Sequence, residues 1–569
     1  MRVLIFHGYL LHGTGSNVYN ANLAAALVRL GHEVHLLCQD RAPDELPFVD
    51  AVGDWDAGQL AVRALREPVR CTVYRPALAG LLPVYVADRY EGIEARPYPD
   101  CSDAEVEAYV EANVRAVRDI VARVRPDVAL ANHLVMGPLI FARALPEDVP
   151  YAVKVHGSDI EYTVAPHPER FVPPAREGVA RASGLLVGSG HIADRLVGTL
   201  DDETLRARIR LGPPGVDVAR FAPRAPDEAH AGLRALADRL AAQEAAPAGE
   251  EGARSAFARD VGEAATALAD VARGLGDDPA TDRAQAAGDP RAIGRDRLVA
   301  FVGKLIVSKG IDLLLAAWPL VLQREPRARL VVVGFGAYRG AVERMCGALA
   351  DGDLRALDAL VAAGRAEEGG PRAPLRLLRA FLDGLRGAER GAYFAAAAGL
   401  RERVVLTGRL DHDELADLLP ACEALVVPST FPEAFGMVAA EGAACGALPV
   451  CARHSGLAEV AEALAQAVPP PARPWLAFGV TGAAGHARGK ACETAAGEAG
   501  GNPVVAIAEH VCAWLGAPAT LRDEVRTALA ATVRERWSWE GVARGVIAAA
   551  QLNADAGARE RSPGELPLR

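Results

Sequence analysis

The sequence predicts a two-domain α/β protein in which each domain is a doubly wound parallel sheet covered by helices. Three observations lead to this prediction. The chain has 569 residues, which is too many for a single hydrophobic core. Short apolar runs alternate with segments of helical spacing in both halves of the chain. A stretch rich in Ala, Asp, Glu, Arg and Gly, with few large apolar residues, separates the two series.

The first domain, residues 1–208, opens with a strand, a loop and a helix. The apolar run at 2–6 predicts a buried strand, and the helical spacing at 17–30 is closed by Gly31. A second strand follows at 34–38. Further strands are expected at 127–131, 152–155 and 184–188, and a further helix at 105–124. This order is typical of a parallel sheet with crossover helices.

The second domain, residues 209–536, repeats the alternation. Strands are expected at 298–302, 329–334, 404–408 and 424–428, and helices near 503–515 and 520–535. Two Ala-rich insertions, about 225–297 and 350–400, interrupt the series. The first insertion has no strand pattern, so we predict that it is helical or partly disordered and that deletion of 230–290 with a short Gly/Ser bridge leaves donor binding intact.

The last residues form a separate helix and a tail. Ser538 is a suitable N-cap for a terminal helix within 537–552, and 553–569 is expected to be a flexible tail. Two doubly wound domains in tandem leave a cleft at the carboxyl ends of their sheets, where ligands of such folds bind.

Charge and hydropathy restrict the partners and the location. The net charge is -11 and the pI is near 5.7, which argues against a nucleic-acid surface. No run is long enough to span a bilayer, and the apolar run at 2–6 is too short for a signal peptide, so we expect a cytoplasmic protein whose membrane contact, if any, is peripheral. Nine cysteines without a C-x-x-C pair predict reduced thiols.

Lysine is scarce, which makes its positions informative. Only four of the 62 basic residues are Lys, and two of them, Lys304 and Lys309, lie in one loop directly after a predicted strand. Gly303 and Gly310 let the backbone approach a ligand closely, so both lysines can converge on one anion. The alternative is a surface loop with two solvated lysines.

The segment 429–450 gives the strongest signal. A helix that begins near Gly436 presents the backbone N–H groups of Phe435, Gly436 and Met437, which favours binding of a phosphate. Glu433 and Glu441 would repel phosphate, so we expect them to accept hydrogen bonds from sugar and ribose hydroxyls. The alternative makes Glu433 a partner of the helix dipole and Glu441 part of a solvated face.

With these motifs the chain resembles glycosyltransferase family 4, whose members are retaining enzymes with the GT-B fold. The resemblance covers both halves in order. It implies that Gly303, Lys304 and Lys309 bind the donor diphosphate. It also implies that Glu433 meets hydroxyls of the transferred sugar and that Glu441 meets the ribose.

In the first domain the resemblance assigns two further positions. Gly15, in the loop Gly13-Thr14-Gly15, corresponds to the family's glycine-rich loop, and His156 corresponds to its active-site histidine. The segment 537–540 resembles the start of the family's terminal helix, which packs back on the first domain. Lys304 stands where the family often has Arg.

Weaker signals have simpler interpretations. Asp411-His412-Asp413 matches a metal-binding D-x-D motif, but Asp413 is better explained as a helix N-cap. His133 is better explained as structural than as a cleft residue. Gly13 to Gly15 with Asp40 mimics a nicotinamide-binding unit, although the loop from His7 to Gly15 is too long for one.

The sequence and the resemblance together predict a hexosyltransferase. The donor would be a UDP- or GDP-sugar, the acceptor a sugar, a polyol or a lipid-linked molecule, and no metal or other cofactor would be required. His156, Lys304, Lys309 and Glu433 would act in catalysis. The alternatives are a nucleotide-sugar epimerase or hydrolase on the same fold and a catalytically silent nucleotide-sugar-binding module.

Overall fold

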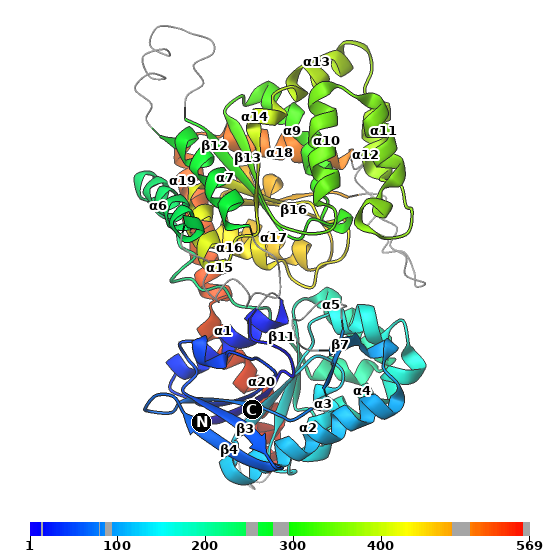
Figure 1. Ribbon diagram of the computed structural model, residues 1–569, viewed down its shortest axis with the longest axis vertical. Coiled ribbons are helices and arrows are strands. Elements are labelled where there is room, and N and C mark those ends of the chain that lie inside the picture. Colours follow the sequence, from blue (N-terminus) through cyan, green and yellow to red (C-terminus); the bar gives the residue numbers. More distant parts are fainter. Residues whose placement is uncertain are drawn as a thin grey trace, which may run out of the picture. The chain divides into compact units, whose positions relative to one another are not determined.

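The computed structural model describes residues 1–12, 15–78, 80–85, 94–245, 260–276, 295–480 and 501–560, with backbone only for 553–560 (Figure 1). Gly13, Thr14 and the end of the predicted tail lie outside these ranges. The chain divides into two units. Unit 1 contains Met1–Gly215 and the chain from Trp537 on, and unit 2 contains the described residues between Val216 and Arg536. The first division falls seven residues after the predicted boundary at 208.

Unit 1 is built on a nine-stranded sheet with the order β11-β10-β9-β8-β1-β2-β5-β3-β4. All neighbours are parallel except the antiparallel pair β3 and β4. The strands are β1 (Arg2–Phe6), β2 (Glu33–Leu37), β3 (Ala51–Asp56), β4 (Gln59–Ala64), β5 (Cys71–Arg75), β8 (Val128–Asn132), β9 (Tyr151–Lys154), β10 (Gly184–Val187) and β11 (Ile209–Leu211). A separate pair contains β6 (Leu81–Val84) and β7 (Glu94–Pro97).

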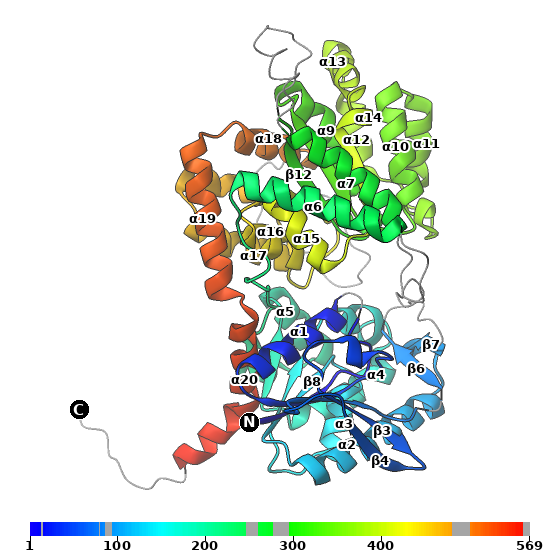
Figure 2. The same cartoon turned by 60° about the vertical axis from the view of Figure 1, so that its left-hand side comes forward.

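Helices cover this sheet, and the last helix of the chain is one of them (Figure 2). The helices are α1 (Ser16–Arg29), α2 (Asp103–Val124), α3 (Gly137–Ala144), α4 (Pro168–Ala180), α5 (Gly190–Leu200) and α20 (Trp539–Glu560). α20 contacts α1 and strands β8, β9 and β10, and it follows the N-cap position of Ser538. A Cβ atom on Gly184 would lie 2.6 Å from the carbonyl oxygen of Ala549, so glycine permits this close packing.

Unit 2 is built on a six-stranded parallel sheet with the order β14-β13-β12-β15-β16-β17. The strands are β12 (Arg297–Val302), β13 (Ala328–Val333), β14 (Val404–Gly408), β15 (Cys422–Val427), β16 (Leu448–Ala452) and β17 (Ala477–Phe478). The central strands are buried along almost their whole length, as expected of a sheet covered on both faces.

The helices of unit 2 include two groups within the predicted insertions. The main helices are α9 (Ile311–Arg324), α10 (Arg339–Asp351), α14 (Leu400–Arg403), α15 (His412–Leu418), α16 (Met437–Ala444), α17 (Ser455–Ala467), α18 (Pro503–Leu515) and α19 (Ala519–Arg536). Within the first insertion lie α6 (Pro226–Ala245) and α7 (Val261–Leu275), and within the second lie α11 (Leu354–Ala363), α12 (Arg376–Gly384) and α13 (Gly387–Ala397).

The expectation that the first insertion can be removed does not fit its packing. α6 and α7 lie side by side, and α7 contacts β14 (Figure 2). Leu233, Leu236 and Leu268 are fully buried, and Arg329 of β13 forms an ion pair with Asp270. Deleting these helices would expose a wall of the unit 2 core, which costs about 1.5–3 kcal/mol for each large apolar side chain. The packing therefore argues against this prediction, and deletion of 230–290 would test it.

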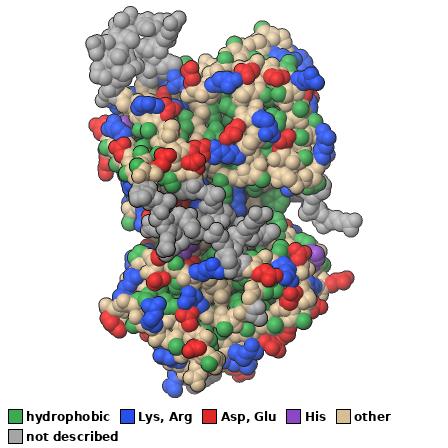
Figure 3. All heavy atoms as spheres, viewed as in Figure 1, with side chains coloured by type: hydrophobic (Ala, Val, Ile, Leu, Met, Phe, Trp, Pro, Cys, Tyr) green, Lys and Arg blue, Asp and Glu red, His purple; other side chains and the backbone are tan. Residues whose placement is uncertain are grey.

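Other features of the described residues concern charge, thiols and membranes. Figure 3 shows basic and acidic side chains interspersed over the coloured part of the visible face, without a continuous basic stripe there. Eight described cysteines are free thiols. In the part of the chain that the structure describes, no single helix is long and apolar enough to cross a membrane, and only α18 with α19, bent by 108°, meet the length and composition criteria as a pair.

Candidate active site

In unit 2 the loop after β12 and the loop after β15 contact each other at the carboxyl ends of their strands. The loop after β12 contains a 3₁₀ turn, Val307–Lys309, and then Gly310 begins α9 with a positive φ of 70°. A Cβ atom at Gly310 would lie 2.0 Å from the carbonyl oxygen of Pro428. Thr430 N donates to Ser308 O over 2.8 Å. Both the positive φ and the close contact with Pro428 require glycine at 310. This glycine allows the loop after β12 to pack directly against the loop after β15.

Lys309 and Glu433 form an ion pair across these loops. The Ser429 hydroxyl also donates to Glu433 Oε1 over 2.7 Å, and the Glu433 backbone N–H donates to Ser455 Oγ over 2.8 Å. Burial alone would raise the pKa of Glu433, but the charge of Lys309 and the hydrogen bonds from Lys309 and Ser429 outweigh it and lower the pKa. Glu433 is therefore an ionised, half-buried acceptor at neutral pH.

The N-terminus of α16 lies three residues after Glu433. Gly436 has a φ of 120°, and a Cβ atom there would lie 2.6 Å from Leu457. Phe435 is 6% exposed and anchors the turn. The backbone N–H groups of Met437 and Val438 have no acceptor among the described residues. The helix therefore begins where the sequence predicts, with donors free for an anion.

Glu441 lies one turn inside α16 and is only 2% exposed. His412 Nε2 contacts Glu441 Oε1 at 2.8 Å. Burial lowers the pKa of His412, but the charge of Glu441 and its hydrogen bond outweigh this and raise the pKa. The alternative of a solvated face for Glu441 is therefore wrong, because the side chain is buried against a histidine.

The D-x-D segment has a different role from the one predicted for Asp413. Asp411 is the N-cap of α15 and forms a capping box with Glu414, whereas Asp413 lies two residues further on, in the first turn, and forms an ion pair with Arg220. The helix begins two residues earlier than expected because Asp411 has an acidic partner three residues later. His412, between the two acids, is thereby directed to Glu441.

Gly303 and Lys304 continue directly from β12. Gly303 N donates to Val333 O over 3.0 Å, and a Cβ atom on Gly334 would lie 2.1 Å from Gly303 O. The loops after β12 and β13 therefore pack backbone against backbone. Lys304 is half-buried at the same end of the sheet as Lys309. Between the two lysines, the Val307 backbone N–H donates to the Glu368 carboxylate over 2.8 Å, which ties the second insertion to this loop.

In unit 1, His156 belongs to a chain of hydrogen bonds at the carboxyl ends of β9, β8 and β1. His156 Nε2 lies 2.9 Å from Asn132 Oδ1. Asn132 Nδ2 donates to Asn20 Oδ1 over 2.8 Å, and Asn20 Nδ2 donates to His7 Nδ1 over 3.0 Å. His7 Nε2 then donates to Asn17 Oδ1 over 3.0 Å. Strand ends and α1 thus fix the orientation of His156.

This chain assigns the tautomer of His156. The Asn132 amide nitrogen also donates to the Phe6 carbonyl, so the amide oxygen is the acceptor and His156 Nε2 carries the hydrogen. Burial, together with His133, Lys154 and His7, lowers the pKa of His156 well below its ordinary value. His156 is therefore neutral, and its Nδ1 lone pair has no donor among the described residues.

Rings surround His156, and His133 is one of them. His133 is 2% exposed and lies 4.6 Å from His156 and 4.2 Å from Tyr85, between ring centroids. Neither ring nitrogen of His133 has a hydrogen-bond partner among the described residues. The neighbouring Asp159 carboxylate accepts hydrogen bonds from the backbone N–H groups of Leu134, Gly157 and Ile160. His133 is thus packed within the cluster.

Gly15 occupies the N-cap position of α1, with φ 62° and ψ -124°. It is exposed, and a Cβ atom there would meet nothing within 4 Å. Its backbone conformation, not its surroundings, therefore requires glycine. The helix that it opens carries Asn17, Tyr19 and Asn20 toward His156.

Sequence reasoning missed Ser429, His454, His412, Asn132 and Asn20. His454 Nε2 donates to Ser429 O over 2.7 Å and so supports the residue that holds Glu433. These side chains come from separate elements and have no spacing that identifies them. Among the described residues, no group of three or more His, Cys, Asp or Glu side chains is arranged to hold a metal ion.

Comparison with known proteins decides the family. The model of the glycosyl transferase 4-like domain matches residues 14–215, and the model of glycosyl transferases group 1 matches 386–471. The chain is a GT-B glycosyltransferase of the family 4 type. The glycosyltransferase is 24% identical over 453 residues to the D-inositol 3-phosphate glycosyltransferase of Xylanimonas cellulosilytica, covering 78% of this chain and 77% of that protein.

Other similarities are shorter or concern the fold. An uncharacterized glycosyltransferase of Methanocaldococcus jannaschii is 27% identical, but the match spans only 29% of each chain. The glycosyltransferase superposes on sucrose-phosphate synthase from Thermosynechococcus elongatus with a TM-score of 0.51 at 17% identity, covering 98% of this chain and 99% of that one. The catalytic domain of starch synthase IV from Arabidopsis thaliana gives 0.50 at 12% identity, covering 97% and 99%. These likenesses support the GT-B fold.

Proposed function

We propose that this glycosyltransferase moves a hexosyl group from a UDP- or GDP-sugar to a hydroxyl acceptor, with retained anomeric configuration and without a required metal. The observation that carries the proposal is the ionised Glu433, held by Lys309 and Ser429 three residues before the N-terminus of α16, where the N–H groups of Met437 and Val438 have no acceptor among the described residues. Backbone N–H groups that can bind an anion lie beside a carboxylate that can accept hydrogen bonds from hydroxyl groups. These two features match the diphosphate and the sugar of a sugar diphosphate.

In this proposal the diphosphate binds at the α16 N-terminus, at Phe435, Gly436 and Met437, and is held by Lys304 and Lys309. Gly303 lets the backbone approach it. Lys309 also compensates the charge of Glu433, so the carboxylate does not repel the phosphate.

The hydroxyl groups of the donor have their own partners. Glu433 accepts hydrogen bonds from the transferred sugar, and Glu441 accepts them from the ribose. In unit 1, Gly15 opens the helix that orients His156, whose neutral Nδ1 accepts a hydrogen bond from a hydroxyl of the sugar. A neutral histidine suits this positioning role better than that of a sole general base.

The bond between the sugar C1 and the diphosphate oxygen breaks in the reaction, and negative charge develops on that oxygen. Lys304, Lys309 and the helix N-terminus stabilise it. The acceptor oxygen forms its bond to C1 on the same face, which retains the configuration, and the departing phosphate oxygen takes the acceptor's proton. We favour this front-face route because no described carboxylate stands out as a nucleophile.

The acceptor is a sugar, a polyol or a lipid-linked molecule. The name of the longest curated match above, D-inositol 3-phosphate glycosyltransferase, supports testing a phosphorylated polyol first. We further propose a cytoplasmic location with no nucleic-acid partner, which the acidic net charge supports.

Two measurements test the proposal. A thermal-shift panel of UDP, GDP, ADP and their sugar conjugates should identify a base, because a ligand at a hundredfold excess over Kd stabilises the folded state by about 2.7 kcal/mol. NMR of the product formed from that donor and D-inositol 3-phosphate or a crude acceptor extract, with and without EDTA, should show a new glycoside of retained configuration in both. Free isomer or free sugar would indicate an epimerase or hydrolase, binding alone a silent module, and no stabilisation would exclude the donor assignment.

A further inference from the structure

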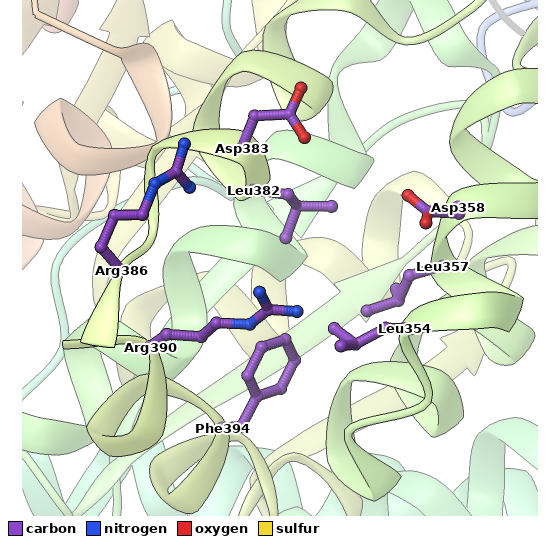
Figure 4. A pocket seen from close by; sticks show the side chains of 8 residues that line it. All are labelled: Leu354, Leu357, Asp358, Leu382, Asp383, Arg386, Arg390 and Phe394. Atoms are coloured by element: carbon purple, nitrogen blue, oxygen red, sulfur yellow. The ribbon is translucent and has the colours of Figure 1, made fainter. Parts of the chain in front are cut away.

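A second candidate site lies in the helical insertion of unit 2. Helices α11, α12 and α13 enclose a cavity of about 460 Å³, within the range of about 300–1,000 Å³ typical of small-molecule pockets. Figure 4 shows side chains from all three helices converging on it. Most of this segment lies between the ranges matched by the two family models, which end at 215 and begin at 386.

The walls of the cavity are fixed by packing behind it. The Tyr393 hydroxyl of α13 donates to the Ala316 carbonyl of α9 over 2.8 Å, and its ring contacts Phe381 of α12 edge to face at 5.4 Å. Arg379 of α12 donates to Asp358 of α11 over 2.7 Å. The buried contact of Tyr393 and the exposed pair of Arg379 with Asp358, which itself lines the cavity, hold the three helices in place.

The side chains that face the cavity carry two kinds of chemistry. The apolar lining consists of Phe394 with three leucines, namely Leu354, Leu357 and Leu382. Leu354 is 40% exposed. Two cations and two acids also line the cavity, Arg386, Arg390, Asp358 and Asp383, and Figure 4 shows Asp358 beside Leu357 and Arg390 beside Phe394.

These charges are only partly used by the protein. The side chains of Arg390 and Asp383 have no hydrogen-bond or ion-pair partner among the described residues. Among the described residues, the Arg386 side chain donates a hydrogen bond only to the Leu385 carbonyl, over 2.9 Å. Donors and acceptors are thus held open beside an apolar surface.

We propose that this cavity binds a neutral saccharide at a distance from the residues proposed for catalysis. Sugar hydroxyls both donate and accept hydrogen bonds, so they can satisfy Asp383 and Arg390 together. The C–H face of a sugar ring can cover Phe394 and Leu354. An anion would instead meet Asp358 and Asp383, and a purely apolar ligand would bury charges without partners.

The inference goes beyond the proposed transfer reaction and does not depend on it. The site would hold a saccharide on the insertion while leaving the nucleotide-binding residues unoccupied. Saccharide binding here should therefore persist when the donor site is filled, and loss of transfer activity through Lys309→Ala should not abolish it.

Saturation-transfer NMR on the full chain tests this assignment, with maltose, cellobiose, sucrose and trehalose as separate probes. Arg390→Ala, Phe394→Ala and Asp383→Asn should each weaken binding of the best probe by about fivefold or more, as expected for loss of one hydrogen bond or ring contact. Arg355→Ala, an exposed arginine of α11 that does not line the cavity, is the matched control and should bind like the wild type. Saturating UDP should leave the signal unchanged.

The outcomes separate the alternatives. Absence of a variant-sensitive signal with all four sugars, in variants whose circular dichroism matches that of the wild type, overturns the proposal. So does competition by UDP, which would place the sugar at the donor site. Displacement of the best disaccharide by sodium phosphate at a concentration below that of the sugar would show an anion site and also reject the saccharide assignment.

Discussion

Lys309 and Glu433 in unit 2 form an ion pair that is partly open to solvent, whereas His156, Asn132 and Asn20 in unit 1 form a neutral chain of hydrogen bonds among tyrosine and histidine rings. In unit 2 an opposite charge keeps the carboxylate ionised despite burial. In unit 1 burial lowers the pKa of His156 and also lowers that of Lys154 to about 7. One region is therefore suited to binding charge and the other to orienting hydroxyls.

The largest expected effect comes from removing charge in unit 2. Lys309→Ala and Lys304→Ala should each lower kcat/KM by about a hundredfold or more, equivalent to roughly 3 kcal/mol, because a stabiliser of the departing diphosphate is lost. Lys304→Arg should stay within about tenfold of the wild type, and Lys309→Arg should cost more, since a planar guanidinium cannot replace a compact ammonium against Glu433.

A pH profile separates the two lysines. Lys309 lowers the pKa of Glu433, so in Lys309→Ala that pKa should rise and the residual activity should fall away at a higher pH on the acid side than in the wild type. Lys304→Ala should keep the wild-type acid limb. Near-wild-type turnover of folded Lys304→Ala and Lys309→Ala would mean that neither lysine stabilises the departing diphosphate.

The two acids of unit 2 should divide between nucleotide and sugar. Glu441→Gln should weaken free UDP or GDP by about tenfold, on the scale of one charged hydrogen bond, whereas Glu433→Gln should spare the free nucleotide and depress turnover of the sugar conjugate. Calorimetric titration with nucleotide and conjugate measures both, with Glu462→Gln on the exposed side of α17 as the control. Equal losses of free-nucleotide affinity would contradict the division.

The same contrast explains what the sequence could predict. The two doubly wound domains follow from apolar runs that alternate with helical segments along the chain, and the start of α16 follows from Gly436, whereas the GT-B fold came from the family resemblance. Strands β3 and β4 carried no such signal, because β4 is largely exposed and β3 contains Gly53 and two aspartates. His7, Asn20 and Asn132 meet only through the sheet order, and no local pattern marks them.

Substitutions of Asn132 test the neutral hydrogen-bond chain of unit 1, and we expect an effect of intermediate size. Asn132→Ala removes the acceptor that fixes the tautomer of His156, so kcat should fall about tenfold, on the scale of a hydrogen bond worth somewhat over 1 kcal/mol, with little change in KM. The nitrogen chemical shifts of His156 should then show mixed tautomers. Asn113→Ala is the matched control, since among the described residues the side chain of this buried asparagine hydrogen-bonds only within α2, to the Tyr109 carbonyl.

Asn132→Asp asks whether neutrality itself matters. A carboxylate beside His156 should raise its pKa toward neutrality, so activity should decline as pH falls through that new pKa while remaining near normal in alkali. An Asn132→Asp enzyme with the pH profile of the wild type would show that the protonation state of His156 has no part in the reaction.

The smallest effect concerns an exception within unit 2, where Asp312 resembles the neutral groups of unit 1. Asp312 lies in the first turn of α9, is 4% exposed, and its Oδ1 has no hydrogen-bond partner among the described residues. Burial, with a smaller contribution from the charge of Glu368, raises its pKa to about 7. Between about pH 4 and pH 7 the folded state therefore binds more protons than the unfolded chain, so this contribution to stability is complete below the unfolded pKa and is lost as pH rises through 7.

Asp312→Asn should remove this loss of stability. Urea unfolding at pH 5 and pH 8 should show the variant gaining stability relative to the wild type at the higher pH, at up to about 1.4 kcal/mol per pH unit between pH 4 and pH 7. The exposed Asp383→Asn serves as the control and should parallel the wild type. Parallel behaviour of Asp312→Asn as well would mean that Asp312 is ionised in the folded state across this pH range.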